Sequence, residues 1–146
     1  MAGGGPEEQN LRLLAAKEGI VDRVHFTGYL TQKDLIPLYQ DADIFVLPAV
    51  LAQHWGIPNV LVEALACEVP VVTTPLPSLP ELVEDGVTGL VARDQDPADL
   101  AAQIERLARD PELRRRLGQA GRRRVEERFD IEVNVVEVAK ALGAAS

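Results

Sequence analysis

Cysteine is nearly absent from this sequence, which has a single one, Cys67, among its 146 residues. A lone cysteine cannot form an internal disulfide, so the chain fits a reducing compartment. We expect a cytoplasmic protein in which Cys67 packs as a small apolar side chain. Metal ligands are also scarce, because two histidines and one cysteine far apart are too few for a zinc site. We therefore expect no metal and no other cofactor.

Long apolar runs are missing as well. No stretch of about 18 apolar residues is present, so no helix is predicted to span a membrane. The first residues, MAGGGPEEQ, contain neither a basic region nor an apolar stretch, and we expect no signal peptide. Hydrophobic residues make up 47% of the chain, which is enough for one domain with a buried core over residues 1–146.

Basic residues are few in the first hundred positions, where five Lys and Arg stand against fifteen Asp and Glu. Such a surface repels polyanions, so we expect no nucleic-acid partner. The arginines gather instead in two triplets, 114–116 and 122–124. The spacing of Arg122 and Glu126 predicts a solvated, salt-bridged helix. Weak attraction to anionic lipid, peripheral to the inner membrane, is the alternative interpretation of these triplets.

The chain does contain a regular alternation of short β-rich runs and helix-like stretches. This alternation predicts an α/β fold with a parallel sheet and helices on both faces. The predicted strands are 24–28, 43–48, 70–74 and 89–92. The predicted helices lie within 7–19, 31–42, 58–67 and 78–86, followed by carboxy-terminal helices from about 97 to 142. Two of the latter open with Asp-Pro, in which Asp caps the helix and Pro suits its first position.

In a parallel α/β sheet, ligands bind beyond the carboxyl ends of the strands, near a topological switch point. The loops that follow the predicted strands are 28–30, 48–56, 74–80 and 92–97. The longest of them leads into the stretch HWGIPNVLVEALACE at positions 54–68. A ligand site is therefore expected where this stretch begins.

One carboxylate, Glu63, stands among the apolar residues 60–66 of this stretch. Gly56 and Pro58 predict a helix start near Asn59, where the first amides lack internal acceptors and favour a phosphate. Glu63 lies further along and can accept hydrogen bonds from the hydroxyls of a ribose, each worth about 1.5–3 kcal/mol. The alternative is a solvent-facing polar stripe. The apolar flanks argue against it, because glutamate is rarely buried without a partner.

The segment GIPNVLVEALACEVPVVTTPLPSLPELVEDGVTGLVA, at positions 56–92, resembles the donor-binding half of a retaining glycosyltransferase of the GT-B fold, family 4 (group 1). The likeness begins upstream at GGGPEE and continues downstream to RRVEERFDIEVNV, so it covers nearly the whole chain. It implies a Rossmann-like domain of the GT-B carboxy-terminal type that binds a nucleotide-diphosphate sugar for glycosyl transfer.

The resemblance also implies roles for individual residues. Glu63 matches the second glutamate of the family motif, which contacts the ribose of the donor. The residues that would surround the diphosphate are Gly56, Pro58, Asn59 and Val60. Tyr29 and Leu30 would border the base through their backbone.

The sequence departs from the family pattern at three positions. Trp55 stands where the motif has its first acidic residue, and an indole cannot accept a hydrogen bond from a sugar hydroxyl. Trp55 either fills space left by missing strands, the preferred interpretation, or stacks on a base or sugar. Pro77-Ser78 replaces a glycine pair, and Ser78 joins Trp55 as a sugar-side candidate. Glu68 replaces a glycine, a change expected to be mild at the surface.

The resemblance further implies that parts of the family domain are absent. These are the first strand, its helix, most of the second strand, and an Arg and a Lys that neutralise the diphosphate, besides an acceptor-binding domain. We hypothesise a fragment that binds the donor but is inactive as an isolated chain. The alternative is a non-catalytic nucleotide-binding remnant or an interaction module that completes its sheet with a partner. A flavodoxin-like regulator is disfavoured, because no acidic cluster with a partner Lys stands at the strand ends.

Overall fold

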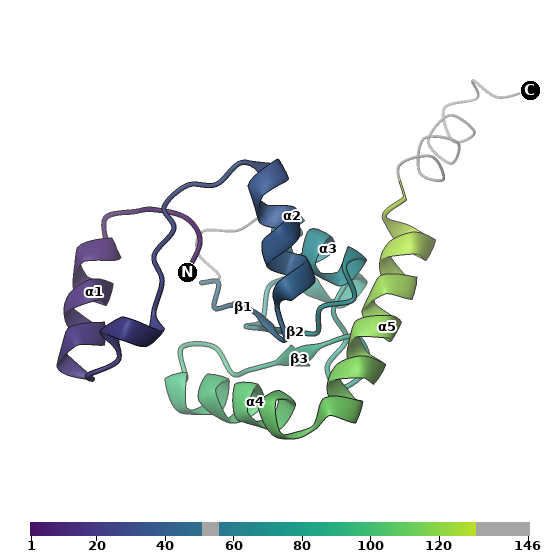
Figure 1. The fold of residues 1–146 in the computed structure, drawn as a ribbon. Helices are drawn as coiled ribbons and strands as arrows, with labels where there is room; N and C mark the ends of the chain where they lie inside the picture. The colour runs from purple at the N-terminus through teal and green to yellow at the C-terminus, as the bar shows by residue number, and fades with distance from the viewer. Residues whose placement is uncertain (51–55, 131–146) are drawn as a thin grey trace, which may run out of the picture. The chain divides into compact units, whose positions relative to one another are not determined.

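The computed structural model describes residues 1–50 and 56–130, which divide between two compact units (Figure 1). The first unit spans residues 1–38, and the second begins at Tyr39. Two sequence predictions, the helix from about 131 to 142 and the role of Trp55, lie outside the described residues. No helix in the described part of the chain is both long and apolar enough to cross a membrane.

The second unit is built on a three-stranded parallel sheet. Its strands are β1 (Phe45–Leu47), β2 (Val71–Thr73) and β3 (Leu90–Val91), in the order β1-β2-β3. The register pairs Phe45 with Val71 and Thr73 with Val91. The parallel α/β fold and three of the four predicted strands are therefore confirmed, although each strand is shorter than its apolar run.

The central strand β2 is covered on both faces, as its continuous apolar sequence predicts. Val71, Val72 and Thr73 are all fully buried, although successive side chains of a strand point to opposite faces. On one face Val72 belongs to a core cluster built with α4 (Pro97–Arg109) and α5 (Pro111–Arg128). The buried members of this cluster are Val72, Leu90, Leu107, Leu113 and Leu117.

The two Asp-Pro sequences begin α4 and α5 as predicted. Asp96 accepts a hydrogen bond from the Asp99 amide at 3.0 Å, and Asp110 accepts one from the Leu113 amide at 2.9 Å. Pro97 and Pro111 occupy the first helical positions, where a missing N–H costs nothing. These local hydrogen bonds explain why sequence spacing alone located both helix starts.

The arginine triplets hold α5 to the rest of the second unit. Arg122 forms the predicted pair with Glu126 at 2.7 Å, and it also donates to the Ala66 carbonyl at 2.7 Å. Arg124 reaches Glu84 at 3.0 Å. Arg114 donates to the Leu107 and Ala108 carbonyls, which lie in the last turn of α4. Arg122 and Arg124 therefore make long-range contacts, and Arg114 binds the end of the preceding helix.

The first unit contains α1 (Glu8–Lys17), the 3-10 turn η1 (Val21–Arg23) and the start of α2 (Gln32–Asp41). Gly19 ends α1 in the left-handed region, with φ of +67°, as its position in the sequence predicts. At the start of α2 the Thr31 hydroxyl donates to the Asp34 carboxylate at 2.6 Å. The two side chains at this helix start therefore bind each other.

The predicted strand at 24–28 is wrong. The segment is irregular, and only Gly28 forms isolated bridges, to Ala2 and Gly3. Its backbone bonds run from the Gly3 amide to the Gly28 carbonyl and from the Thr27 amide to the Met1 carbonyl. A strand requires a continuous neighbouring strand, and the neighbour here is a short glycine-rich segment that pairs at one point.

The helix α3 (Asn59–Ala66) ends in a left-handed turn at Glu68. The Glu68 amide donates to the Leu65 carbonyl and the Val69 amide donates to the Ala64 carbonyl, which together form a Schellman motif. Glu68 occupies the position of this motif that glycine favours, with φ of +60°. Its side chain is at the surface, as expected, but its backbone is strained.

A close contact joins α3 to α5 at two glycines. A Cβ atom at Gly118 would lie 2.0 Å from the Glu68 carbonyl oxygen, and one at Gly121 would lie 2.3 Å from Leu65 Cδ2. Both distances are too short for any side chain. The absence of side chains at these positions therefore allows α5 to pack directly on the end of α3.

Replacement of Glu68 by glycine should stabilise the protein by about 1 kcal/mol, because glycine adopts a left-handed conformation without steric cost. Urea unfolding monitored by circular dichroism measures this change. Glu68→Ala is the matched control, since it removes the same carboxylate but keeps the Cβ atom. An equal gain in both variants would show that the carboxylate, and not the backbone, is the source of the strain.

Gly118→Ala should destabilise the protein by about 2–3 kcal/mol, because the added methyl group meets a backbone carbonyl that cannot rotate away. Helix propensity alone favours alanine over glycine by about 1 kcal/mol, so the two effects have opposite signs. The same urea measurement decides between them. The exposed substitution Arg123→Ala on the same helix should change stability by less than about 0.5 kcal/mol.

Candidate functional site

The carboxylate of Glu63 lies on α3, four residues after the helix begins at Asn59. Residues four apart share one face of a helix, so Glu63 lies one turn below Asn59 on the same face. Asn59 is exposed and Glu63 is half-buried. The opposite face of α3 packs into the core through Leu61, Ala64 and Leu65, which are fully buried.

Glu63 is held by a tyrosine from a distant part of the chain. The Tyr39 hydroxyl donates a hydrogen bond to Glu63 Oε2 at 3.0 Å. The Tyr39 ring is only 5% exposed and packs edge-on against Phe45, with ring centroids 5.7 Å apart. The carboxylate therefore does not point into bulk water as the polar stripe of a surface helix would.

Burial raises the pKa of the Tyr39 phenol well above its usual value, and the hydrogen bond to the negatively charged Glu63 raises the pKa further. Both effects disfavour the phenolate form. The phenol therefore acts as a neutral hydrogen-bond donor over the physiological pH range, and its bond holds the Glu63 carboxylate in a fixed orientation.

The start of α3 is open to an anion. Pro58 precedes the helix with φ of −64° and ψ of 124°, and its side chain provides no cap. The Leu61 amide donates to the Pro58 carbonyl at 3.0 Å, whereas the amides of Asn59 and Val60 have no acceptor within the helix. The helix dipole adds about half a positive charge at this end. The half-buried Pro58 and Val60 and the exposed Gly56 and Asn59 surround it.

The other predicted site residues lie elsewhere in the chain. Ser78 is half-buried and directly precedes the 3-10 turn η3 (Leu79–Glu81), while Pro77 is exposed. Tyr29 and Leu30 belong to the first unit. The Tyr29 side chain is 84% exposed, and its hydroxyl donates to the Gly4 carbonyl at 2.8 Å.

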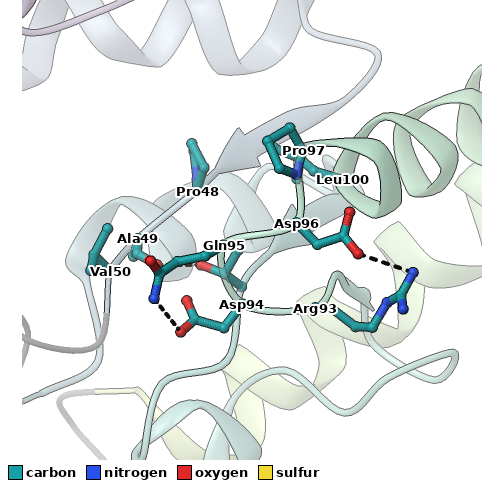
Figure 2. A pocket seen from close by; sticks show the side chains of 10 residues that line it. Pro48, Ala49, Val50, Arg93, Asp94, Gln95, Asp96, Pro97 and Leu100 are labelled. Carbon is teal, nitrogen blue, oxygen red and sulfur yellow. Dashed lines mark hydrogen bonds and ion pairs between the residues drawn. The ribbon is translucent and has the colours of Figure 1, made fainter.

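A hollow of about 160 Å³ lies at the carboxyl ends of the three strands, as Figure 2 shows. It is lined by residues 48–50 after β1, Thr74 after β2, and residues 93–97 with Leu100 after β3. Glu63 is not one of its lining residues. The position agrees with the rule that ligands bind beyond the carboxyl ends of parallel strands.

Sequence reasoning identified the loop 92–97 but not Asp94, the polar residue that now stands out within it. Asp94 Oδ1 is buried and has no hydrogen-bond partner among the described residues. The other oxygen, Oδ2, accepts a 3.3 Å bond from Gln95, as Figure 2 shows. Arg93 pairs instead with Asp96 at 3.0 Å. The signal in the sequence was the place of Asp94 directly after a predicted strand, which the nearby carboxylates of Asp96 and Asp99 obscured.

Within residues 1–50 and 56–130, no three His, Cys, Asp or Glu side chains gather closely enough to hold a metal ion. The described site offers hydrogen-bond donors and acceptors: the Glu63 carboxylate, the first amides of α3 and the Tyr39 hydroxyl. Such a set can bind hydroxyl groups and an anion side by side.

Comparison with known proteins gives one family. The family described as "Glycosyl transferases group 1" matches residues 1–124. A D-inositol 3-phosphate glycosyltransferase of Streptomyces bingchenggensis is 36% identical over 132 residues, which are 86% of this chain and 28% of that protein. The chain thus spans less than a third of the length of that relative.

Solved structures of the same fold also match. Sucrose-phosphate synthase from Thermosynechococcus elongatus has a TM-score of 0.79 and 31% identity, over 99% of this chain and 38% of that one. The Anabaena protein Alr3699/HepE in complex with UDP has a TM-score of 0.83 over 99% of this chain and 40% of that one. Its 24% identity makes it evidence for the fold alone.

The pairing of Tyr39 with Glu63 predicts an unusual titration. In a Tyr29→Phe variant Tyr39 is the only tyrosine, so phenolate absorbance near 295 nm reports on it alone. Half-ionisation of Tyr39 should require a pH well above about 10. Glu63→Gln in this background should lower the pKa of the phenol, because it removes a negative charge. Identical titration curves with Glu63 and Gln at this position would contradict the pairing.

The same shift sets an upper pH limit on stability. A phenol whose pKa is raised by folding stabilises the folded state below the unfolded pKa of about 10, and this contribution is lost as the pH rises further. Urea midpoints measured between pH 8 and 11 should therefore fall above pH 10. The fall should be smaller in Tyr39→Phe, which has no phenol to ionise.

Proposed function

Because this chain belongs to the group 1 glycosyltransferase family, we propose that it forms the donor-binding site of a retaining GT-B glycosyltransferase. Its ligand is a nucleotide-diphosphate sugar, and the activity of the whole enzyme is glycosyl transfer from that donor to an acceptor. The observation that supports this proposal best is Glu63, a half-buried carboxylate held by Tyr39 one turn from the open start of α3.

Glu63 accepts hydrogen bonds from the ribose hydroxyls of the donor in this proposal. A hydrogen bond to a charged group contributes about 1.5–3 kcal/mol, roughly twice that of a neutral pair. A ribose is neutral and has two adjacent hydroxyls, and a carboxylate can accept hydrogen bonds from both of them. The half-buried setting strengthens these bonds, because less water competes for the carboxylate than at a fully exposed position.

The diphosphate of the donor lies at the start of α3. The amides of Asn59 and Val60 face it with the positive end of the helix dipole, and Gly56 and Pro58 allow the backbone to approach closely. When the bond from the sugar to the diphosphate breaks, negative charge accumulates on the leaving phosphate oxygen. Fixed donors at this position stabilise that charge more in the transition state than in the bound donor.

Glycosyl transfer in this proposal depends mostly on positioning. The ribose contact and the phosphate contact lie one turn apart on a single helix, so they hold the donor in one orientation. Trp55 and Ser78 are the sugar-side candidates, of which Trp55 lies outside the described residues. No metal ion is part of this scheme.

These 146 residues span 28% of the first matched relative and about 40% of the Anabaena structure bound to UDP. We infer that the isolated chain binds the donor without transferring it, because acceptor groups belong to the remainder of such an enzyme. The alternative is a non-catalytic nucleotide-binding or interaction module. Attraction to membrane lipid is not included, since Arg114, Arg122 and Arg124 already bind groups within the chain.

Isothermal titration calorimetry with UDP, GDP and ADP tests the proposal. One of the three should bind, and Glu63→Ala should weaken that nucleotide by about 1.5–3 kcal/mol, or roughly 10- to 150-fold. Glu68→Ala is the matched control, because it removes an exposed carboxylate five residues further along without touching the site. Absence of binding by all three nucleotides would support the interaction module instead.

A further inference from the structure

We propose that Tyr39 is a positioning residue for the donor, which orients the Glu63 carboxylate toward the ribose before the nucleotide arrives. The inference rests on the proposed function and adds a residue that the motif around α3 does not contain. Tyr39 is 24 positions away from Glu63 in the sequence, yet its hydroxyl donates to Glu63 Oε2 at 3.0 Å.

The ring of Tyr39 is itself held in place. It is 5% exposed and packs edge-on against Phe45, the first residue of β1, at an interplanar angle of 62°. A tyrosine has only two side-chain torsions, and burial among packed groups restricts both. The Tyr39 hydroxyl is therefore held in a fixed position by the packing of its ring against the start of β1.

Glu63 gains most from such a fixed donor. A glutamate side chain has three rotatable bonds, and ordering them at the moment of binding costs entropy. The hydrogen bond from Tyr39 restricts the carboxylate in the absence of ligand. The bond thus holds Oε2 of the carboxylate in place before a ligand binds.

A purely structural role for this hydrogen bond makes a different prediction. A buried tyrosine hydroxyl needs an acceptor in any fold, and its loss would then loosen the whole site. Binding of every nucleotide would weaken equally, whatever its sugar. A positioning role acts only through the ribose hydroxyls that donate hydrogen bonds to Glu63. Its effect should therefore be seen with the ribose form of a nucleotide and be lost with the deoxyribose form.

The test uses the full chain and the nucleoside diphosphate that binds best among UDP, GDP and ADP, together with its 2′,3′-dideoxy form (the deoxynucleotide), which lacks both adjacent hydroxyls. Tyr39→Phe removes the hydroxyl but keeps the ring that packs on Phe45. It should weaken the ribonucleotide about 3- to 10-fold and the deoxynucleotide less than twofold. In a Glu63→Ala background, Tyr39→Phe should cause no further loss for the ribonucleotide. Thermal unfolding of each variant shows that the protein is folded.

The outcomes separate the inference from the function on which it rests. Equal weakening of both nucleotides by Tyr39→Phe, or an undiminished effect in the Glu63→Ala background, would overturn the positioning role alone. Loss of binding by Glu63→Ala with full affinity in Tyr39→Phe would do the same. Failure of the unsubstituted chain to bind any of the three nucleotides would overturn the proposed function, and the positioning role with it.

Discussion

The hydrogen bond from Tyr39 to Glu63 is the interaction on which the candidate site depends, because it fixes the one carboxylate of an otherwise apolar helix. Partial burial removes water from a carboxylate at a cost in free energy, and a hydrogen bond within the protein offsets part of that cost. The bond also joins the end of α2 to α3, two elements separated by the first strand. The raised pKa of the Tyr39 phenol keeps it a neutral donor over the range in which the protein would bind a nucleotide.

The helix that presents Glu63 is held rigid at its other end. Its C-terminal turn is closed by a Schellman motif at Glu68, and Gly118 of α5 packs directly against the Glu68 carbonyl. Arg122 adds a hydrogen bond to the Ala66 carbonyl, which satisfies one of the last acceptors of α3.

The hollow at the strand ends adds a second polar group to the carboxyl edge of the sheet. Asp94 places a buried oxygen there without a partner among the described residues, and the adjacent Gln95 adopts a left-handed conformation with φ of +52°. Both are uncommon in a loop with a purely structural role. Glu63 and this hollow are separate features of the same α/β unit, and the group 1 glycosyltransferase family accounts for the architecture that holds both.

The sequence by itself determined the features that depend on neighbours a few residues apart. The Asp-Pro helix starts at Asp96 and Asp110, the helix around Glu63 and three strands follow from local hydrogen bonds and continuous apolar runs. Only the tertiary structure decided that 24–28 is not a strand, that Tyr39 is the partner of Glu63, and that Glu68 is strained. Each of these three features depends on a group distant in the chain or on a backbone angle. The spacing of residues along the sequence encodes neither a distant partner nor a backbone angle.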